Sequence, residues 1–246
     1  MTMDNADSNT KTKVPIKLSE IDYTPILLAA AVGFVIIAIF VILKRRGSSR
    51  RDFMFAGLCE SGKTAIFMQM LYKKFPDTFT STTENVGEYT SGRMSGRLVD
   101  IPGHYRVRDK YFDQYKRTAK GIIFVVDAVT AQKEIRDVAD ALYTILCDGA
   151  TVSCPFLVLC NKQDLPTAKS AQVIRAILEK ELNIVRDTRS RKLQSVGDNE
   201  TSKFVYLGKE GRDFEFTQLQ QNIQFFECSA KANELSNVSD WIDRML

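Results

Sequence analysis

From residue 53 onward, apolar runs and segments of helical character alternate along the chain. Two of the runs, residues 121–127 and 155–161, are continuously apolar, which is typical of strands buried on both faces of a sheet. The predicted strands are residues 53–57, 86–91, 96–100, 121–127, 155–161 and 224–228, with a hairpin closing around residues 92–95. The predicted helices are residues 64–74, 105–118, 131–147, 168–182 and 235–245. This order predicts an α/β fold with a mostly parallel central sheet and flanking helices.

An uncharged, apolar stretch occupies residues 25–43. Its 19 residues would form a helix about 28 Å long, close to the hydrocarbon thickness of a bilayer. A signal peptide would have a shorter apolar core and a basic leader, whereas residues 1–24 carry three lysines against four acidic residues. A buried core helix would rarely stay uncharged over this length and then meet a basic cluster. We therefore expect one N-terminal transmembrane helix after a short polar tail.

The charges around this stretch predict its orientation. Basic residues follow it, namely Lys44, Arg45, Arg46, Arg50 and Arg51. Lys17, Glu20 and Asp22 precede it, so the positive-inside rule places the tail, residues 1–24, in the lumen and the rest of the chain in the cytosol. Residues 44–52 form a basic linker that is short enough to keep the domain at residues 53–246 close to the membrane.

Residues 183–221 form a long, polar segment of mixed charge inside the predicted domain. A segment of this length without secondary structure is usually functional or disordered. We expect a solvated insertion at residues 186–202, whereas the aromatic residues within 204–216 are expected to pack against the domain.

Residues 57–64 read Gly-Leu-Cys-Glu-Ser-Gly-Lys-Thr and match the pattern G-x-x-x-x-G-K-[ST] of a phosphate-binding loop. A predicted strand precedes the loop and a predicted helix follows it, so a bound phosphate would meet a helix N-terminus. The glycines let backbone N–H groups point at phosphate, Lys63 supplies a cation, and the Thr64 hydroxyl can bind Mg²⁺. The expected nucleotide contacts here are Gly57, Leu58, Cys59, Glu60, Ser61, Gly62, Lys63, Thr64 and Ala65. A chance glycine turn is the alternative, and three further motifs in the right order make it improbable.

Residues 100–104, Asp-Ile-Pro-Gly-His, lie between a predicted strand and a predicted helix. Asp100 can reach Mg²⁺ through a water, and the N–H of Gly103 can meet the γ-phosphate. His104, the single histidine of the chain, stands where such enzymes hold the residue that orients the attacking water. The alternative is a surface histidine without a catalytic role.

A Thr- and Ser-rich segment, residues 78–83, should provide a hydroxyl that completes the Mg²⁺ shell. The sequence leaves Thr80, Ser81 and Thr82 open for this role. Thr78, Thr80 and Ser81 are also expected to contact the nucleotide, and the alternative for the segment is a plain surface loop.

Residues 161–164, Asn-Lys-Gln-Asp, end an apolar strand. An aspartate there can accept two hydrogen bonds from the N1–H and N2–H₂ groups of guanine, a donor pair that adenine lacks. The stem of the lysine can lie along the base, and the N–H of Ala230 after the last strand can donate to guanine O6. The expected residues of the base site are Asn161, Lys162, Asp164, Ser229, Ala230 and Lys231.

Composition and charge narrow the function further. The chain is 44% hydrophobic and 26% charged, which is typical of a globular protein. Its net charge of +4 is too small to indicate direct nucleic-acid binding. The five cysteines show no metal-ligand spacing, and the placement of Cys154, Cys160 and Cys228 in or beside apolar runs indicates a reducing compartment.

These motifs in this order resemble the small GTPase family, and Gly-Leu-x-x-x-Gly-Lys-Thr with a compact hairpin is most similar to its Arf-like branch. The layout of one N-terminal span, a basic junction and a GTPase domain resembles the family of signal recognition particle receptor β subunits. Further segments resemble the same family, namely residues 100–104, 124–127, 132–143, 161–164, 168–182, 207–216 and 227–231. The resemblance covers nearly all of the chain from residue 25, except residues 186–202, and implies a P-loop small-GTPase fold.

The resemblance also implies a function. It implies GTP and Mg²⁺ as cofactors and a single-pass protein of the endoplasmic reticulum membrane with a cytosolic C-terminal domain. The GTP-bound form would hold the receptor α subunit at the membrane, with the ribosome and the translocon as further partners. His104 replaces the glutamine usual in Ras- and Arf-like enzymes, and no arginine can be identified as a finger in cis. Hydrolysis is therefore expected to be slow or to depend on a partner.

Two other functions compete with this binding switch. An Arf- or Sar-like trafficking GTPase would turn over repeatedly, but no myristoylation glycine follows Met1, and residues 25–43 lack a polar face. A scaffold with a purely structural nucleotide would not need every motif residue, and all of them are present.

Overall fold

The computed structural model describes residues 24–30, 32–34, 37, 50–195 and 206–246. The chain forms two compact units, Met1–Gly47 and Ser48–Leu246. In the first unit the described residues are helical, and the rest of the predicted span at residues 25–43 lies outside the described residues, as do the tail at 1–23 and the linker residues 44–49. Within the described ranges, no helix combines the length and the apolar character that crossing a bilayer requires.

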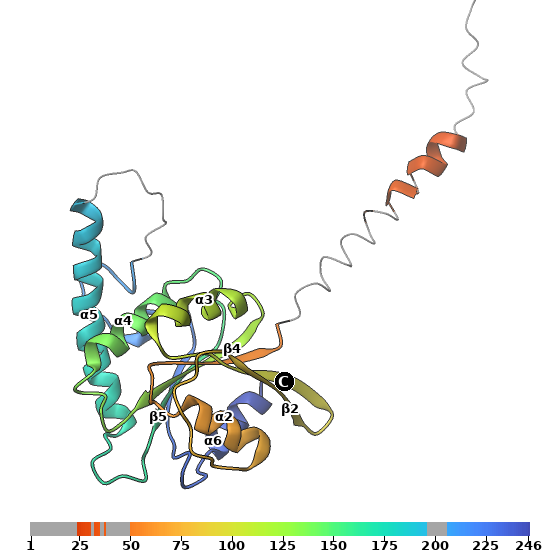
Figure 1. The fold of residues 1–246 in the computed structure, drawn as a ribbon. Coiled ribbons are helices and arrows are strands. Elements are labelled where there is room, and N and C mark those ends of the chain that lie inside the picture. Colours follow the sequence, from red (N-terminus) through yellow and green to blue (C-terminus); the bar gives the residue numbers. More distant parts are fainter. Residues whose placement is uncertain (1–23, 31, 35–36, 38–49, 196–205) are drawn as a thin grey trace, which may run out of the picture. The chain divides into compact units, whose positions relative to one another are not determined.

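The second unit is organised around a six-stranded sheet with the strand order β2-β3-β1-β4-β5-β6 (Figure 1). The strands are β1 (Asp52–Ala56), β2 (Asn85–Ser91), β3 (Met94–Asp100), β4 (Ala119–Asp127), β5 (Phe156–Asn161) and β6 (Ile223–Glu227). The β2–β3 pair is an antiparallel hairpin, and all other neighbours in the sheet are parallel. The predicted α/β architecture with a mostly parallel sheet is confirmed.

Helices cover both faces of the sheet. They are α2 (Lys63–Tyr72), α3 (Tyr105–Tyr115), α4 (Ile135–Leu146), α5 (Ala171–Ser195) and α6 (Ser236–Asp243), with a short 3₁₀ helix η2 (Phe216–Gln218). Figure 1 shows α3, α4 and α5 on one face and α2 and α6 on the other. Side chains of β4 alternate between the two resulting cores, because Ile122 and Phe124 pack into one and Ile123 and Val125 into the other. This two-sided burial explains the continuous apolar runs of the central strands.

The main difference from the prediction concerns α5, which continues through Ser195. The insertion expected at residues 186–202 is therefore helical over residues 186–195, where Asp187 and Thr188 are exposed but Arg186 is buried, and residues 196–202 lie outside the described part of the chain. Arg186 explains the difference, because its side chain is directed inward and the residue is only 3% exposed. Its guanidinium donates to the carbonyls of Leu207 and Lys209, at 3.4 and 3.3 Å, and to that of Arg212.

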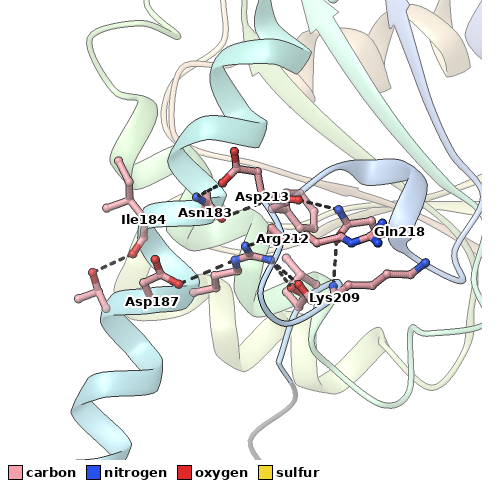
Figure 2. A network of polar contacts seen from close by, with 11 residues as sticks. Asn183, Ile184, Asp187, Lys209, Arg212, Asp213 and Gln218 are labelled. Carbon is pink, nitrogen blue, oxygen red and sulfur yellow. Dashed lines mark hydrogen bonds and ion pairs between the residues drawn. The ribbon is translucent and has the colours of Figure 1, made fainter.

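The segment that follows α5 is tied to this helix by further polar contacts (Figure 2). The amide of Asn183 donates to the Asp213 carboxylate at 3.2 Å, and the Gln218 amide donates to the Asp213 carbonyl at 2.6 Å. Phe214 and Phe216 are buried in the core beneath these contacts. The expectation that the aromatic segment packs against the domain is confirmed for its described residues, 206–216.

Candidate functional site

The predicted motifs meet at one edge of the sheet. Because β1, β3, β4, β5 and β6 are parallel, their C-terminal ends lie together, and we call this surface the carboxyl edge. The segments that emerge there are residues 57–62, 101–104, 128–134, 162–170 and 228–235. Ligands of open α/β sheets bind outside the carboxyl ends of the strands, so this edge is the expected place for a site.

Two glycines shape the phosphate-binding loop. Gly57 and Gly62 have φ angles of 136° and 90°, which side-chain-bearing residues rarely adopt. A Cβ atom at Gly62 would lie 2.2 Å from the side-chain nitrogen of Asn161, and one at Gly57 would lie 2.3 Å from the carbonyl oxygen of Val125. The loop can therefore approach its neighbours this closely only with glycine at both positions.

Lys63 is enclosed by the loop that it follows. The residue is 5% exposed, and its Nζ atom donates to the carbonyl of Leu58 at 2.6 Å and to the hydroxyl of Ser61 at 3.4 Å. Burial lowers the pKa of the Lys63 ammonium, while the charge of Asp100 opposes this shift. The ammonium thus has neutral hydrogen-bond acceptors where a bound phosphate would provide a charged one.

Oxygen atoms converge beside Lys63 in a pattern that suits Mg²⁺. The Thr64 hydroxyl donates to Asp100 Oδ2 at 2.7 Å and lies 3.2 Å from the Ser81 hydroxyl, and the Asn85 amide donates to the same Oδ2 atom at 3.0 Å. The other oxygen, Oδ1, is buried without a hydrogen-bond partner among the described residues. Burial raises the pKa of the Asp100 carboxyl, and the hydrogen bonds from Thr64 and Asn85 oppose this shift. Mg²⁺ prefers oxygen ligands, and Asp100 Oδ1 has no other partner among the described residues, so this cluster fits a magnesium site.

A hollow of about 270 Å³ lies over this cluster. Its walls come from the phosphate-binding loop, from the hydroxyl-rich segment and from residues 101–103; the predicted nucleotide contacts that line it are Cys59, Glu60, Gly62, Lys63, Thr64, Thr78, Thr80, Ser81 and Gly103. Gly103 packs closely against the phosphate-binding loop, because a Cβ atom at this position would lie 2.4 Å from the backbone nitrogen of Cys59. Thr80, Ser81 and Thr82 are the candidates for the hydroxyl that completes the Mg²⁺ shell. Of these, Ser81 is the one that contacts Thr64.

His104 takes a different position from the one its predicted role suggests. Its side chain is exposed, caps α3 by accepting from the N–H of Arg106 at 3.4 Å, and stacks on Tyr105 with ring centroids 4.7 Å apart. It lines a second hollow, of about 370 Å³, together with Arg108 and acidic residues at the start of α4. The structure therefore does not bring His104 into the hollow that contains Lys63.

The predicted base-site residues are joined by hydrogen bonds. Asn161 donates to the carbonyl of Ser61 at 2.9 Å and accepts from the N–H of Ala230 at 3.1 Å, so it connects the phosphate-binding loop to the loop after β6. Asp164 accepts a hydrogen bond from the Ser229 hydroxyl at 2.7 Å. Lys231 is exposed in the turn that follows.

Two positioning residues were missed by sequence reasoning. Asp127 forms an ion pair of 2.6 Å with Lys162, which has a left-handed backbone with φ of 71°. Asn85 holds Asp100 from the neighbouring strand. A signal for Asp127 was available, because it is a polar residue at the end of an apolar strand; nothing in the sequence distinguishes Asn85 before the hairpin is paired.

Two of the five cysteines take part in this arrangement. Cys59 lines the phosphate hollow, and the Cys228 thiol donates to Asn161 Oδ1 at 3.5 Å. All five lie in the described part of the chain, and none forms a disulfide. Burial raises the pKa of Cys160 to about 12, so this thiol stays protonated and behaves as a small apolar side chain. Within the described residues, no group of three or more His, Cys, Asp or Glu side chains is placed to hold a metal.

The sequence of this chain is similar to that of one known protein family. The family model for the signal recognition particle receptor beta subunit matches residues 48–223. The signal recognition particle receptor subunit beta of Rattus norvegicus is 42% identical over 216 residues, covering 84% of this chain and 80% of the relative.

Two solved structures of signal recognition particle receptors are also similar to this chain. The structure of the mammalian SRP receptor contains a chain with 38% identity and a TM-score of 0.71, covering 80% of this chain and 100% of its own. An SRb-GTP/SRX complex from Chaetomium thermophilum has a TM-score of 0.63 over 81% of this chain and 100% of its own, and at 20% identity it shows the fold alone. The chain belongs to the signal recognition particle receptor beta subunit family.

Proposed function

We propose that this protein is the membrane-anchored, GTP-binding subunit of a signal recognition particle receptor, whose GTP-bound form holds the α subunit at the endoplasmic reticulum. The observation that carries the proposal is that a candidate site for phosphate and Mg²⁺ is joined to a candidate site for the base at the carboxyl edge. The cluster of Lys63, Thr64 and Asp100 fits a magnesium triphosphate, and Asn161 joins it directly to the loop that bears Asp164.

The phosphates are bound by the loop at residues 57–64. Its backbone N–H groups and the buried Lys63 ammonium supply positive potential, and Thr64, with Asp100 through a water, would hold Mg²⁺. When bound, Mg²⁺ neutralises charge on the phosphate oxygens. Ser81 is the hydroxyl that we assign to complete the metal shell, because it already contacts Thr64 at 3.2 Å.

Guanine is selected by Asp164. Its carboxylate is oriented by the Ser229 hydroxyl and can accept from N1–H and N2–H₂ of the base, whereas adenine would leave those acceptors unmet. Lys162, held by Asp127, provides an apolar stem for the base plane. The partner nucleotide is therefore GTP rather than ATP.

The α subunit would bind beside the γ-phosphate hollow. Phe79 and Tyr105 flank this region and are 89% and 63% exposed, so two large aromatic side chains are available to a partner. Phe79 lies within residues 78–83 and Tyr105 follows Gly103, two segments that would respond to the third phosphate. The named SRb-GTP/SRX complex of the relative supports a receptor partner in the GTP state.

Slow hydrolysis suits a switch of this kind better than repeated turnover does. His104 lies outside the phosphate hollow, and among the described residues lining that hollow there is no arginine. The partner or a further factor would have to supply the missing charge. Anchoring by residues 25–43, with the domain in the cytosol, completes the proposal.

Bound-nucleotide analysis of the full chain in detergent tests the proposal. We expect GTP or GDP, and no adenine nucleotide, in the protein as isolated. Capture of the α subunit should then require GTP and fail with GDP. The proposal is excluded if neither calorimetry nor chromatography of the released ligand finds a guanine nucleotide.

A further inference from the structure

The sheet has a second edge, opposite the phosphate-binding loop, where the parallel strands begin. The N–H of Arg51 donates to the carbonyl of Thr118 at 3.1 Å, and the N–H of Arg97 donates to the carbonyl of Arg51 at 2.9 Å. The end of α6 returns to the same edge, because Lys120 donates to the carbonyl of Leu246 at 3.2 Å. We call this surface the amino edge and define it as residues 50–52, 93–97, 113–120, 148–154 and 243–246.

The amino edge is more basic than the domain as a whole. Residues 50–246 contain 28 basic and 26 acidic residues, whereas the amino edge alone contains eight basic residues and four acidic ones. Arg50 and Arg51 supply half of the excess at this edge, and the distribution of charge over the domain supplies the rest. Folding gathers it on one surface from strand starts and helix ends that are distant in the sequence.

Three of the four acidic residues form ion pairs with two cations within the domain. Asp52 is fully buried and accepts from two nitrogens of Arg97, each at 2.7 Å. Lys116 lies between Asp113 and Asp148, and it contacts the second of these at 2.8 Å. These five residues form closed ion pairs that leave little charge for a ligand.

Four further cations of the amino edge form no ion pair with a carboxylate within the described residues. Arg50 donates to a serine hydroxyl at 2.9 Å, and Arg244 donates to a backbone carbonyl at 3.0 Å. Arg51 and Arg93 are exposed. The positive charge of these four side chains is thus available to an external anion.

We infer that the amino edge is a membrane-contact surface that binds the anionic headgroups of phospholipids. This inference rests on the proposed membrane anchor. Only eight residues separate residue 43 from β1, so the chain can span at most about 30 Å between the apolar stretch and this edge. The tether keeps the local concentration of lipid high, and each cation near an anionic surface adds to the attraction. An anionic bilayer thereby orients the carboxyl edge away from itself, toward cytosolic partners.

Hydrogen exchange of the full chain in lipid nanodiscs tests the inference. We expect peptides covering residues 50–52, 93–97, 116–120 and 243–246 to exchange more slowly in discs containing about 30 mol % phosphatidylserine than in pure phosphatidylcholine. About 0.5 M NaCl should remove this protection, because it shortens the Debye length to a few ångströms. The variant R50Q/R51Q/R93Q/R244Q should lose the protection by about tenfold or more.

A matched control neutralises four cations elsewhere on the domain. The variant K133Q/R136Q/K169Q/K180Q has the same net charge and should keep the protection. Equal exchange in both kinds of disc, protection that survives high salt, or equal loss in the control would overturn the inference. Protection by added duplex RNA, with none from phosphatidylserine, would overturn it in favour of a nucleic-acid partner. GTP retention measured on the same discs separates these outcomes from failure of the proposed nucleotide site.

Discussion

The two edges of the central sheet differ in their charge balance and in how they hold their charges. The carboxyl-edge segments, residues 57–62, 101–104, 128–134, 162–170 and 228–235, contain four acidic and four basic residues, and Lys63, Asp100 and Asp127 adjoin them. There the important charges, those of Lys63, Asp100 and Asp127, are buried and fixed by partners. At the amino edge the excess is basic and mostly exposed. Buried, fixed charges select one ligand geometry, whereas exposed charges respond to the average charge of a surface.

This difference predicts that single substitutions will be severe at the carboxyl edge and mild at the amino edge. A fixed site fails when one contact is lost, because buried polar groups around it are left unpaired. A diffuse patch loses only a fraction of its attraction with each charge. The predictions below test this contrast, in order of decreasing effect.

The largest effect is expected from Gly62→Ala. The new methyl group meets the Asn161 amide at 2.2 Å and is strained at φ 90°, so both the loop and its link to the base site are disrupted. Strain and a lost hydrogen bond together cost about 4 kcal/mol, or about a thousandfold in GTP affinity. Titration calorimetry measures the change. Gly92→Ala is the control, because Gly92 also has a positive φ, of 61°, but has nothing within 4 Å of a Cβ atom; an equal loss there would disprove the geometric explanation.

Arg186→Met tests a region that belongs to neither edge. The substitution leaves the buried carbonyl of Leu207 and the partly buried carbonyls of Lys209 and Arg212 without their donor, and we expect the free energy of unfolding to fall by about 3 kcal/mol. Arg189→Met is the control, since Arg189 is partly exposed in its pair with Asp140 and should cost less than about 1 kcal/mol. Chemical denaturation gives both values. GTP affinity should stay unchanged in both folded variants, and a selective loss of affinity would show that α5 supports the site.

Asp164→Asn should change the base preference of the carboxyl edge. An amide in place of the carboxylate offers a donor as well as an acceptor, so xanthosine triphosphate, whose ring carries an oxygen at position 2, should be preferred. We expect GTP affinity to fall by about a hundredfold, with a compensating gain for the xanthosine nucleotide. Competition binding with both nucleotides measures the exchange. Unchanged GTP affinity would remove Asp164 from the base site, and Asp213→Asn, outside both edges, serves as the matched control.

The smallest effect is expected for stability in Asp100→Asn. Burial raises the pKa of this carboxyl, so the ionised form is disfavoured in the folded state and removal of the charge should stabilise the nucleotide-free protein at neutral pH. A gain of about 1 kcal/mol would raise the unfolding midpoint by about 2–4 °C. The same variant should lose the dependence of nucleotide affinity on Mg²⁺. A lower midpoint without nucleotide would contradict the assigned cost of burying Asp100.

The direction of this pKa shift determines whether Asp100 stabilises or destabilises the folded protein, and over which pH range. The carboxyl of Asp100 has a higher pKa in the folded protein than its ordinary value of 3.8, so the folded state binds the proton more tightly. The destabilising contribution is absent below the unfolded pKa and complete above the folded one. The advantage of Asp100→Asn should therefore disappear as the pH is lowered to the unfolded pKa, which thermal scans over acidic pH can follow.

Much of the fold could be predicted because local patterns and packing agree. The apolar runs at residues 121–127 and 155–161 became β4 and β5, and the hairpin formed close to its expected place. The error at α5 has a clear physical cause. Residues 186–195 are polar as a sequence, but Arg186 finds carbonyl partners more than twenty residues ahead, and no local pattern encodes that contact.

The sequence by itself determined which residue types form the candidate site, because a phosphate-binding loop, a magnesium carboxylate and a guanine-selecting aspartate each need a fixed local spacing. The tertiary structure alone decided how these parts meet: Asn161 joining two loops, Asp127 holding Lys162, and His104 placed outside the phosphate hollow. It also decided that the basic residues gather at the opposite edge. Local spacing is written along the chain, whereas contacts between distant segments depend on strand order and direction, which only the folded sheet establishes.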